Sequence, residues 1–334
     1  MSNPRSQSQT ANPRTRVGAR LRKAREALGL SQADVCRRAG VSANAYNQWE
    51  KGRRLINVFD AMKLADSLNI SLDWICRGEG EDRTMQETPT NTTGDEWTEE
   101  TSELFADYGA YFVPERDVQM ETVCSLVPDL TDTPHVVDIC CGEGLMSEAL
   151  LARLPGVMVH AYDGSPTMLA KTRDRLTSYE GRFETREIDI AATDWRSFPW
   201  PVRAFVSSLA VHHLDGPGKQ ALYADLAAAL APGGAVVIAD LVEPETAAGR
   251  AVSAKAWDDA VRNRSLELDG DLAAFAFFRD DQWNYYADPA PDPVDQPSAL
   301  LDQLKWLEAA GLEHVDVHWL KAGHAIFSGR KPLS

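Results

Sequence analysis

The chain has 334 residues, a length that predicts two or three domains, and its 44% hydrophobic and 25% charged residues are typical of a soluble globular protein. No apolar run reaches the ~20 residues of a membrane helix, and the polar amino terminus lacks the core of a signal peptide. The five cysteines are odd in number and lack zinc-like pairs. They indicate reduced thiols in a cytoplasmic protein, and no metal site is expected.

The net charge of −16 is distributed unevenly along the chain. Residues 1–54 contain 12 Lys and Arg against 3 Asp and Glu, about +9, so the remainder carries about −25. The basic part can contact a polyanion, whereas the acidic part cannot easily do so. The charge pattern therefore predicts two domains with different partners.

The pattern along the chain predicts four segments. Residues 1–15 are rich in Ser, Asn, Pro and Arg, which is typical of a disordered arm. Residues 16–79 have a helical pattern and predict a small all-α domain, and the polar residues 80–95 predict a linker. From residue 96 to residue 331, helical stretches alternate with short Val- and Ile-rich runs, which indicates an α/β domain with a mostly parallel sheet.

Seven runs in this last segment are expected to be strands. The final two lie only a few residues apart and should form an antiparallel hairpin at the edge of the sheet. The runs are His135–Cys140, Val157–Tyr162, Phe183–Ile188, Ala204–Ser208, Ala235–Asp240, His314–Leu320 and His324–Ser328.

The sequence pattern of the basic part, within residues 1–54, predicts a compact set of helices. Ser31, with Asp34 reaching back, should cap a second helix, and Ser42 should cap a third helix. Tyr46 and Trp49 should point inward. The polar side chains expected on the outer face are Asn44, Asn47, Gln48 and Lys51.

The segment LGLSQADVCRRAGVSANAYNQWEKGRR resembles the Cro/phage-repressor type of helix-turn-helix, over roughly residues 16–79. The resemblance implies duplex DNA as a partner and a homodimer whose two heads contact half-sites ~34 Å apart. It predicts that Gln32 contacts the DNA backbone and that Arg53 and Arg54 contact phosphates. It also predicts that Ala43, Asn44 and Gln48 contact base edges. The alternative is a small helical bundle used for dimerisation or partner binding.

The segment HVVDICCGEG, residues 135–144, predicts a buried strand that enters a glycine-containing turn and then a helix. Glycines there let the backbone approach a ligand, and the start of the helix offers free N–H groups. A dinucleotide site would use the same geometry, so the turn alone leaves the cofactor open. Asp163, 19 residues after Gly144, can accept both ribose hydroxyls of a nucleoside.

Four further segments, AYDGSPTMLAKTRDRL, Asp189-Ile190, SSLAVHHLD and LAPGGAVVIAD, follow in order. Together with the turn they resemble the class I S-adenosylmethionine-dependent methyltransferases of the small-molecule type, over about residues 97–331. The resemblance implies a Rossmann-like fold and S-adenosylmethionine as cofactor, although Cys140 stands where the family has its first glycine. The residues it assigns to the cofactor are Asp138, Cys140, Gly142, Gly144, Asp163, Gly164, Ser165, Met168, Asp189, Ile190 and Ser208.

Methyl transfer from a sulfonium is an in-line displacement, and it needs a general base only when the acceptor must lose a proton. His212 and His213 follow the fourth expected strand and are candidate bases, with packing or helix capping as the alternative. The segment Glu243–Ser298 stands where the family has insertions that cover the acceptor pocket, so the resemblance implies a lid there. Its aromatic residues indicate an apolar or planar acceptor, with the ordinary core of a lid as the alternative. The candidate acceptor contacts are Tyr108, Tyr111, Trp257, Trp283 and Tyr286.

The sequence therefore predicts an S-adenosylmethionine-dependent methyltransferase that acts on a small-molecule acceptor and carries an N-terminal DNA-binding domain. One alternative is a transcription regulator whose larger domain senses S-adenosylmethionine or a metabolite without turning it over. Another is a protein-methylating enzyme that is recruited to DNA. A nucleic-acid substrate is disfavoured, because the acidic domain would be repelled by phosphates and the sequence motifs of DNA methyltransferases are missing.

Overall fold

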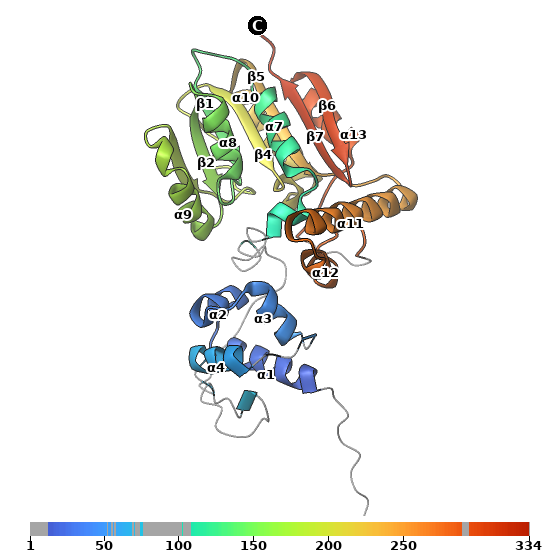
Figure 1. The fold of residues 1–334 in the computed structure, drawn as a ribbon. Helices are drawn as coiled ribbons and strands as arrows, with labels where there is room; N and C mark the ends of the chain where they lie inside the picture. Colours follow the sequence, from blue (N-terminus) through green and yellow to red (C-terminus); the bar gives the residue numbers. More distant parts are fainter. Residues whose placement is uncertain are drawn as a thin grey trace, which may run out of the picture. The chain divides into compact units, whose positions relative to one another are not determined.

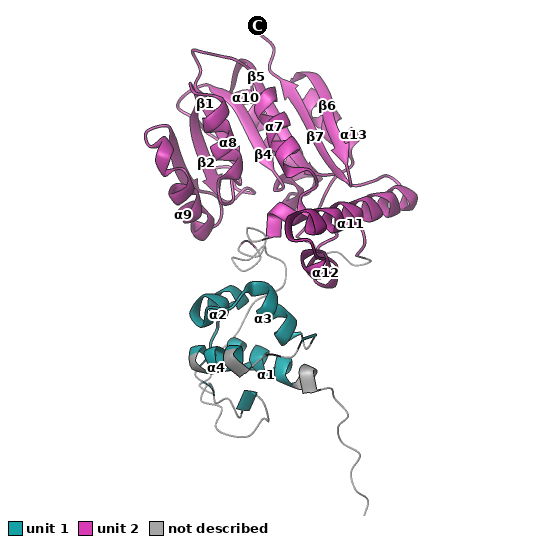
Figure 2. Cartoon of the chain, in the orientation of Figure 1, with its two compact units in different colours: residues 1–94 teal, residues 95–334 magenta. Residues whose placement is uncertain are grey.

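The computed structural model describes residues 13–51, 53–54, 56, 58–68, 70, 74–75, 102, 108–288 and 294–333. The chain divides into two compact units, residues 1–94 and residues 95–334, called the head and the body below (Figure 1; Figure 2). The predicted linker, residues 80–95, lies outside the described residues. Helix α1 (Pro13–Ala27) begins inside the predicted arm, with proline at a position where its missing N–H is not needed.

The head is built from short helices whose ends are fixed by side chains. Ser31 and Asp34 form the expected capping box of α2 (Gln32–Ala39), and Gly40, at φ 62°, ends that helix in a left-handed conformation. Ser42 caps α3 (Ala43–Glu50) by accepting the N–H of Ala45, and α4 (Val58–Ser67) follows. The core of the head consists of Val17, Leu21, Ala24, Val35, Ala39, Tyr46, Trp49, Leu64, Ala65, Leu68, Ile70, Trp74 and Ile75.

The body contains a seven-stranded sheet in the order β3-β2-β1-β4-β5-β7-β6 (Figure 1). The first five strands are parallel, whereas β7 pairs antiparallel with both β5 and β6, which confirms the Rossmann-like α/β class and the edge hairpin. The strands are β1 (His135–Ile139), β2 (Met158–Asp163), β3 (Phe183–Glu187), β4 (Val202–Ser208), β5 (Leu230–Leu241), β6 (Glu313–Lys321) and β7 (His324–Arg330).

Helices cover both faces of this sheet, so its central strands are buried on both sides. Alternate residues of β1 show the two layers, since Val136 packs with α7 and α8 while Val137 packs with α10 and α13. The helices are α7 (Arg116–Leu126), α8 (Leu145–Arg153), α9 (Pro166–Arg175), α10 (Gly216–Ala229), α11 (Ala247–Asp269), α12 (Ala273–Asp280) and α13 (Leu300–Ala309), with 3-10 turns η1 (Thr177–Tyr179) and η2 (Val211–His213).

Helices α11 and α12 form an aromatic cluster beyond the ends of β4 and β5. The cluster includes Leu209 and Leu241, which lie at those two strand ends, and it is packed around Phe112, Trp257 and Phe278. Ligands of parallel α/β sheets bind beyond the carboxyl ends of the strands, so α11 and α12 lie where an acceptor pocket would form. Among the described helices, none is both long and apolar enough to cross a membrane.

Candidate active site

A cavity of about 900 Å³ opens at the carboxyl ends of the parallel strands. Every residue that the sequence assigned to the cofactor lines this cavity except Gly144. Gly144 lies against α9 instead, so close that a Cβ at this position would be 2.9 Å from the side chain of Thr172. The resemblance therefore selected residues that the fold brings together from β1, β2 and β4 and from the segments that follow β1, β2 and β3.

The turn after β1 faces the cavity with its backbone. Cys140 and Gly142 both have φ 56°, in the left-handed region that favours glycine, so Cys140 holds a conformation that is unfavourable for a residue with a Cβ. Burial raises the pKa of the Cys140 thiol well above its usual value, as expected of a packed thiol rather than a nucleophile. A Cβ at Gly142 would meet nothing within 4 Å, so open space lies in front of this backbone.

Asp163, the last residue of β2, is held by two backbone groups. Its Oδ2 accepts the N–H of Gly142 at 2.8 Å, and its Oδ1 accepts the N–H of Ser165 at 2.8 Å. Ser165 in turn caps α9 by accepting the N–H of Met168 at 3.0 Å. Each carboxylate oxygen has a further lone pair, so the oriented carboxylate can still accept ribose hydroxyls from the cavity.

Asp138, within β1, has one satisfied and one unsatisfied oxygen. Its Oδ2 accepts the hydroxyl of Ser147 at 2.6 Å, whereas its Oδ1 is buried without a hydrogen-bond partner. Burial raises the pKa of Asp138 to about 7. A buried carboxylate oxygen at a cavity wall is suited to a cationic ligand group, which would satisfy the oxygen and favour its ionised form.

The opposite wall of the cavity follows β3. The backbone carbonyl of Asp189 accepts the indole N–H of Trp195 at 2.8 Å. The side-chain Oδ1 of Asp189 accepts the N–H of Ala191 at 2.9 Å. Asp189 lies two residues beyond the end of β3, directly after the run Phe183–Ile188 that was expected to be the third strand. Ile190 and Trp195 make this end of the cavity partly apolar, which suits a planar base.

Two polar residues from α7 also line the cavity and were missed by the sequence analysis. They are Arg116, whose pKa is lowered by burial, and Gln119, which donates to the carbonyl of Pro114 at 2.7 Å. Both precede β1 by some twenty residues, and no motif marks them in the sequence. A half-buried arginine at a ligand cavity can pair with a carboxylate.

A second, smaller cavity of about 70 Å³ lies beside the first. Both cavities are lined by Val113 and Leu209. Of the predicted acceptor contacts, Trp257 and Trp283 line the smaller cavity. The full lining is Phe112, Val113, Leu209, His212, Leu241, Trp257, Phe278, Trp283, Asp295 and His324.

The other three predicted acceptor contacts line neither cavity. Tyr286 is buried and donates its hydroxyl to the carbonyl of Val242 at 2.9 Å or that of Gly323 at 2.6 Å. Tyr108 packs in the aromatic cluster, and the hydroxyl of Tyr111 donates to Asp269 at 3.2 Å. For these three tyrosines the structure corrects the prediction, because their hydroxyls or rings are used within the body itself.

The two candidate bases, His212 and His213, form the end of η2 and differ in their surroundings. Burial alone would lower the pKa of His212, but the carboxylates of Asp240 and Asp295 outweigh it and raise this pKa to about 10. His212 is therefore protonated at neutral pH and a poor acceptor of a further proton. His213 lines the larger cavity, where the cofactor residues lie.

In the head, the buried carboxylate of Glu50 connects three helices. It accepts hydrogen bonds from Arg25 of α1 at 2.8 Å, from Gln32 of α2 at 2.6 Å and from Tyr46 of α3 at 3.1 Å. The side-chain nitrogen of Gln32, predicted to contact the DNA backbone, thus bonds within the head. Asn47, expected on the outer face, is 3% exposed, which corrects that prediction.

The other predicted DNA contacts lie along α3 and after it. Ala43, Asn44 and Gln48 are half-buried, and Arg53 and Arg54 are exposed. The Oδ1 of Asn44 is buried without a hydrogen-bond partner. The exposed guanidinium groups are suited to phosphate contacts.

Comparison with known proteins agrees with both units. A helix-turn-helix family model matches residues 21–75, and a methyltransferase domain model matches residues 136–234. The trans-aconitate 2-methyltransferase of Variovorax paradoxus is 32% identical over 212 residues, which cover 60% of this chain and 76% of that protein. The chain belongs to the class I S-adenosylmethionine-dependent methyltransferases.

Other relatives extend this comparison. The trans-aconitate 2-methyltransferase of Paracidovorax citrulli is 36% identical over 154 residues, which cover 45% of this methyltransferase and 56% of that relative, so the match spans little more than half of its length. An O-methyltransferase family protein from Burkholderia thailandensis has the same fold, with a TM-score of 0.50 at 16% identity, over 70% of this chain and 60% of that chain.

The cofactor of this family is S-adenosylmethionine, and the residues present fit it. The unpartnered Oδ1 of Asp138 matches an ammonium group, and the fixed carboxylate of Asp163 matches a ribose. The open backbone at Gly142 leaves room for the ligand between them. When bound, the cofactor supplies an electrophilic methyl group on a sulfonium.

Proposed function

We propose that the body of this methyltransferase transfers a methyl group from S-adenosylmethionine to a small molecule held in the smaller cavity. The observation that carries this proposal is the wall shared by the two cavities, since Val113 and Leu209 line both. An acceptor in the smaller cavity would therefore be adjacent to the cofactor. Such proximity contributes much of the rate of an in-line displacement.

The residues proposed for cofactor binding divide by the part of the ligand that they suit. Asp138 would hold the ammonium group, and Asp163 would accept the ribose hydroxyls. Met168, Asp189 and Ile190 would enclose the adenine. Gly142, Gly164, Ser165 and Ser208 would complete the lining, with Cys140 in the turn.

The acceptor proposed here differs from the one named for the curated relatives. Those proteins are trans-aconitate 2-methyltransferases, and trans-aconitate carries three carboxylates. The residues that line the smaller cavity include aromatic rings such as Trp257 and Trp283, and none of these lining residues is Arg or Lys. This lining suits a planar, largely apolar acceptor better than a polyanion.

Methyl transfer is tested by incubating the full chain with methyl-labelled S-adenosylmethionine and either trans-aconitate or a panel of planar hydroxylated compounds. Labelled product from the planar panel is expected, whereas transfer to trans-aconitate alone would overturn the acceptor assignment. Asp163→Asn should weaken cofactor binding at least tenfold, since it removes a charged acceptor. Asp174→Asn, at an exposed position of α9, is the matched control and should leave it unchanged. Cofactor binding without transfer to any acceptor would instead favour the alternative of a transcription regulator that senses S-adenosylmethionine or a metabolite.

For the head, we propose binding to duplex DNA, with two chains acting as a homodimer. The basic charge of residues 1–54 and the exposed Arg53 and Arg54 after α3 support this proposal. Sedimentation of the full chain with and without duplex DNA tests the stoichiometry. Two chains per duplex are expected, and one chain per duplex would contradict the dimer.

A further inference from the structure

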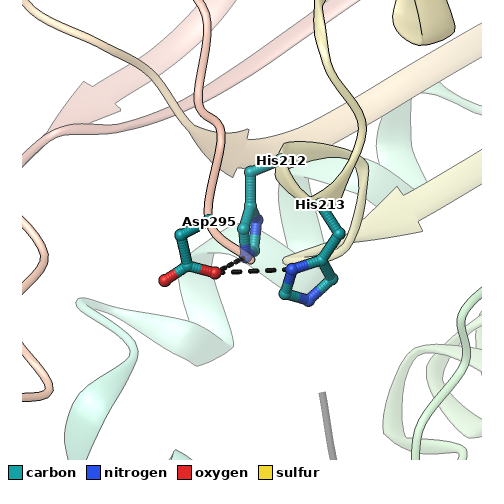
Figure 3. A group of neighbouring side chains, drawn as sticks. All are labelled: His212, His213 and Asp295. Atoms are coloured by element: carbon teal, nitrogen blue, oxygen red, sulfur yellow. Dashed lines mark ion pairs between the residues drawn. The ribbon is translucent and has the colours of Figure 1, made fainter. Parts of the chain in front are cut away.

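Two histidines and one aspartate of the body converge (Figure 3), and each of them lines one of the two cavities. His212 and His213 come from η2, and Asp295 comes from the segment before α13, more than eighty residues later. The Oδ1 of Asp295 lies 3.4 Å from Nε2 of His212 and 3.4 Å from Nδ1 of His213. These three atoms all lie within 4.8 Å of one another.

The two separations from Asp295 match those between ligand atoms around one metal ion. With metal–ligand bonds of about 2.0–2.2 Å at tetrahedral angles, neighbouring ligand atoms are roughly 3.3–3.6 Å apart. The two 3.4 Å separations fall within this range, whereas they are long for a direct hydrogen bond. The buried Oδ1 of Asp295 makes no hydrogen bond of good geometry.

The orientation of His212 is set by a second carboxylate behind it. Nδ1 of His212 lies 2.5 Å from Oδ1 of Asp240, and both side chains are nearly fully buried. A metal ion would displace the proton that Nε2 of His212 carries beside Asp295, while the proton on Nδ1 would stay donated to Asp240. Histidine ligands of metal ions almost always have such a carboxylate or carbonyl partner on the other ring nitrogen.

Asp295 is also held in place through its neighbour in the chain. The backbone N–H of Gln296 donates to the carbonyl of His212 at 2.7 Å, and its carbonyl accepts from Lys219 at 2.5 Å. Nδ1 of His213 lies 3.2 Å from the carbonyl of Val294, so metal binding would exchange that hydrogen bond for a metal bond.

We propose that His212, His213 and Asp295 bind one divalent transition-metal ion, with Zn²⁺ favoured by the two imidazoles and one carboxylate. Three protein ligands leave a position open, as in catalytic metal sites. His213 lines the larger cavity, and His212 and Asp295 line the smaller one, so the open position lies between cofactor and acceptor. Resting on the proposed methyl transfer, this implies an acceptor with a hydroxyl or carboxylate oxygen that can bind the ion.

Metal binding is tested directly on the full-length protein after dialysis against a chelator. Titration with Co²⁺ should give visible absorption bands of a low-coordinate site at one ion per chain, and Zn²⁺ should displace it. His213→Ala and Asp295→Asn should each abolish the bands, and Asp240→Asn should weaken Co²⁺ binding by about 10- to 100-fold. His135→Ala is the matched control, because His135 belongs to another histidine pair, with His160, in the same sheet.

Absence of stoichiometric Co²⁺ and Zn²⁺ binding would overturn the proposal, as would binding that survives both His213→Ala and Asp295→Asn. Circular dichroism and S-adenosylmethionine binding verify that each variant is folded, and His213→Gln replaces any variant that is not. Labelled methyl transfer by the chelator-treated protein separates this inference from the proposed function. Transfer without any bound metal would leave the methyltransferase proposal standing and overturn the inferred role of the ion in binding the acceptor.

Discussion

The carboxylate of Asp240 accepts two hydrogen bonds from one residue, His212: from its backbone N–H at 2.9 Å and from its imidazole at 2.5 Å. Asp240 lies near the end of β5, and His212 lies in the turn after β4. The contact therefore fixes η2 to the neighbouring strand at the edge of the sheet where the cavities open. Both partners are buried, so the pair is shielded from water.

Asp240→Asn should lower the free energy of unfolding by roughly 3 kcal/mol, because removing one partner of a buried ion pair leaves the other charge uncompensated. Urea unfolding followed by circular dichroism measures this change. Asp259→Asn is the control, since Asp259 pairs with Lys255 and both side chains are exposed, so the loss should stay below about 1 kcal/mol. Equal losses for the two variants would contradict the importance of burial.

Cys140→Gly should raise the free energy of unfolding by about 1 kcal/mol, because it relieves the left-handed conformation at φ 56°. Thermal and urea unfolding measure the gain. Cys124→Gly, within α7, makes the same replacement in a right-handed helix and should be destabilising by about 1 kcal/mol or more. A loss of stability in Cys140→Gly would show that the packing of the thiol outweighs the backbone conformation.

The double variant Arg53→Ala/Arg54→Ala should weaken binding of duplex DNA by about tenfold or more near physiological salt. It should also reduce the slope of log affinity against log salt by about 1 to 2, because each phosphate that the protein no longer contacts keeps its counterion. Fluorescence anisotropy of the full chain across a salt series gives both quantities. Lys63→Ala, which removes an exposed lysine of α4, should keep the wild-type slope.

The free energy of unfolding should fall as the pH drops below about 6.5, the usual pKa of an unfolded histidine. Burial lowers the pKa of His160 in the folded state, although Glu184 opposes this, so the unfolded chain binds the proton more readily. This contribution to stability is present above pH ~6.5 and is lost as the pH falls toward the folded pKa. Urea unfolding of His160→Asn should show a flatter pH dependence, whereas His318→Asn, at an exposed site on β6, should retain the wild-type slope.

Much of the fold could be predicted because its signals are local. The Val- and Ile-rich runs predicted the strands, and the turn at Gly142 with Asp163 at the end of β2 predicted which strand ends meet. Parallel strands bring their carboxyl ends to one edge, so spacing along the chain was enough to assemble most of the cavity lining.

The remainder depends on contacts between distant segments. Asp295 reaches His212 across more than eighty residues, and nothing in its own sequence neighbourhood marks it as a partner. Arg116 lies in a helix before the first motif, and the burial of Asn47 depends on how α3 packs in the head. The aromatic residues could be expected only as a group, because packing alone decides that Trp257 and Trp283 line the smaller cavity whereas Tyr286 does not.

The carboxylate of Glu50 has a consequence for how the head could change over evolution. It anchors α3 to two other helices through Arg25 and Gln32, on the side of the helix opposite to solvent. Ala43 and Gln48 take no part in that anchoring and remain partly accessible. Exchanging these two side chains should therefore retarget the head to other operators at little cost to its folding.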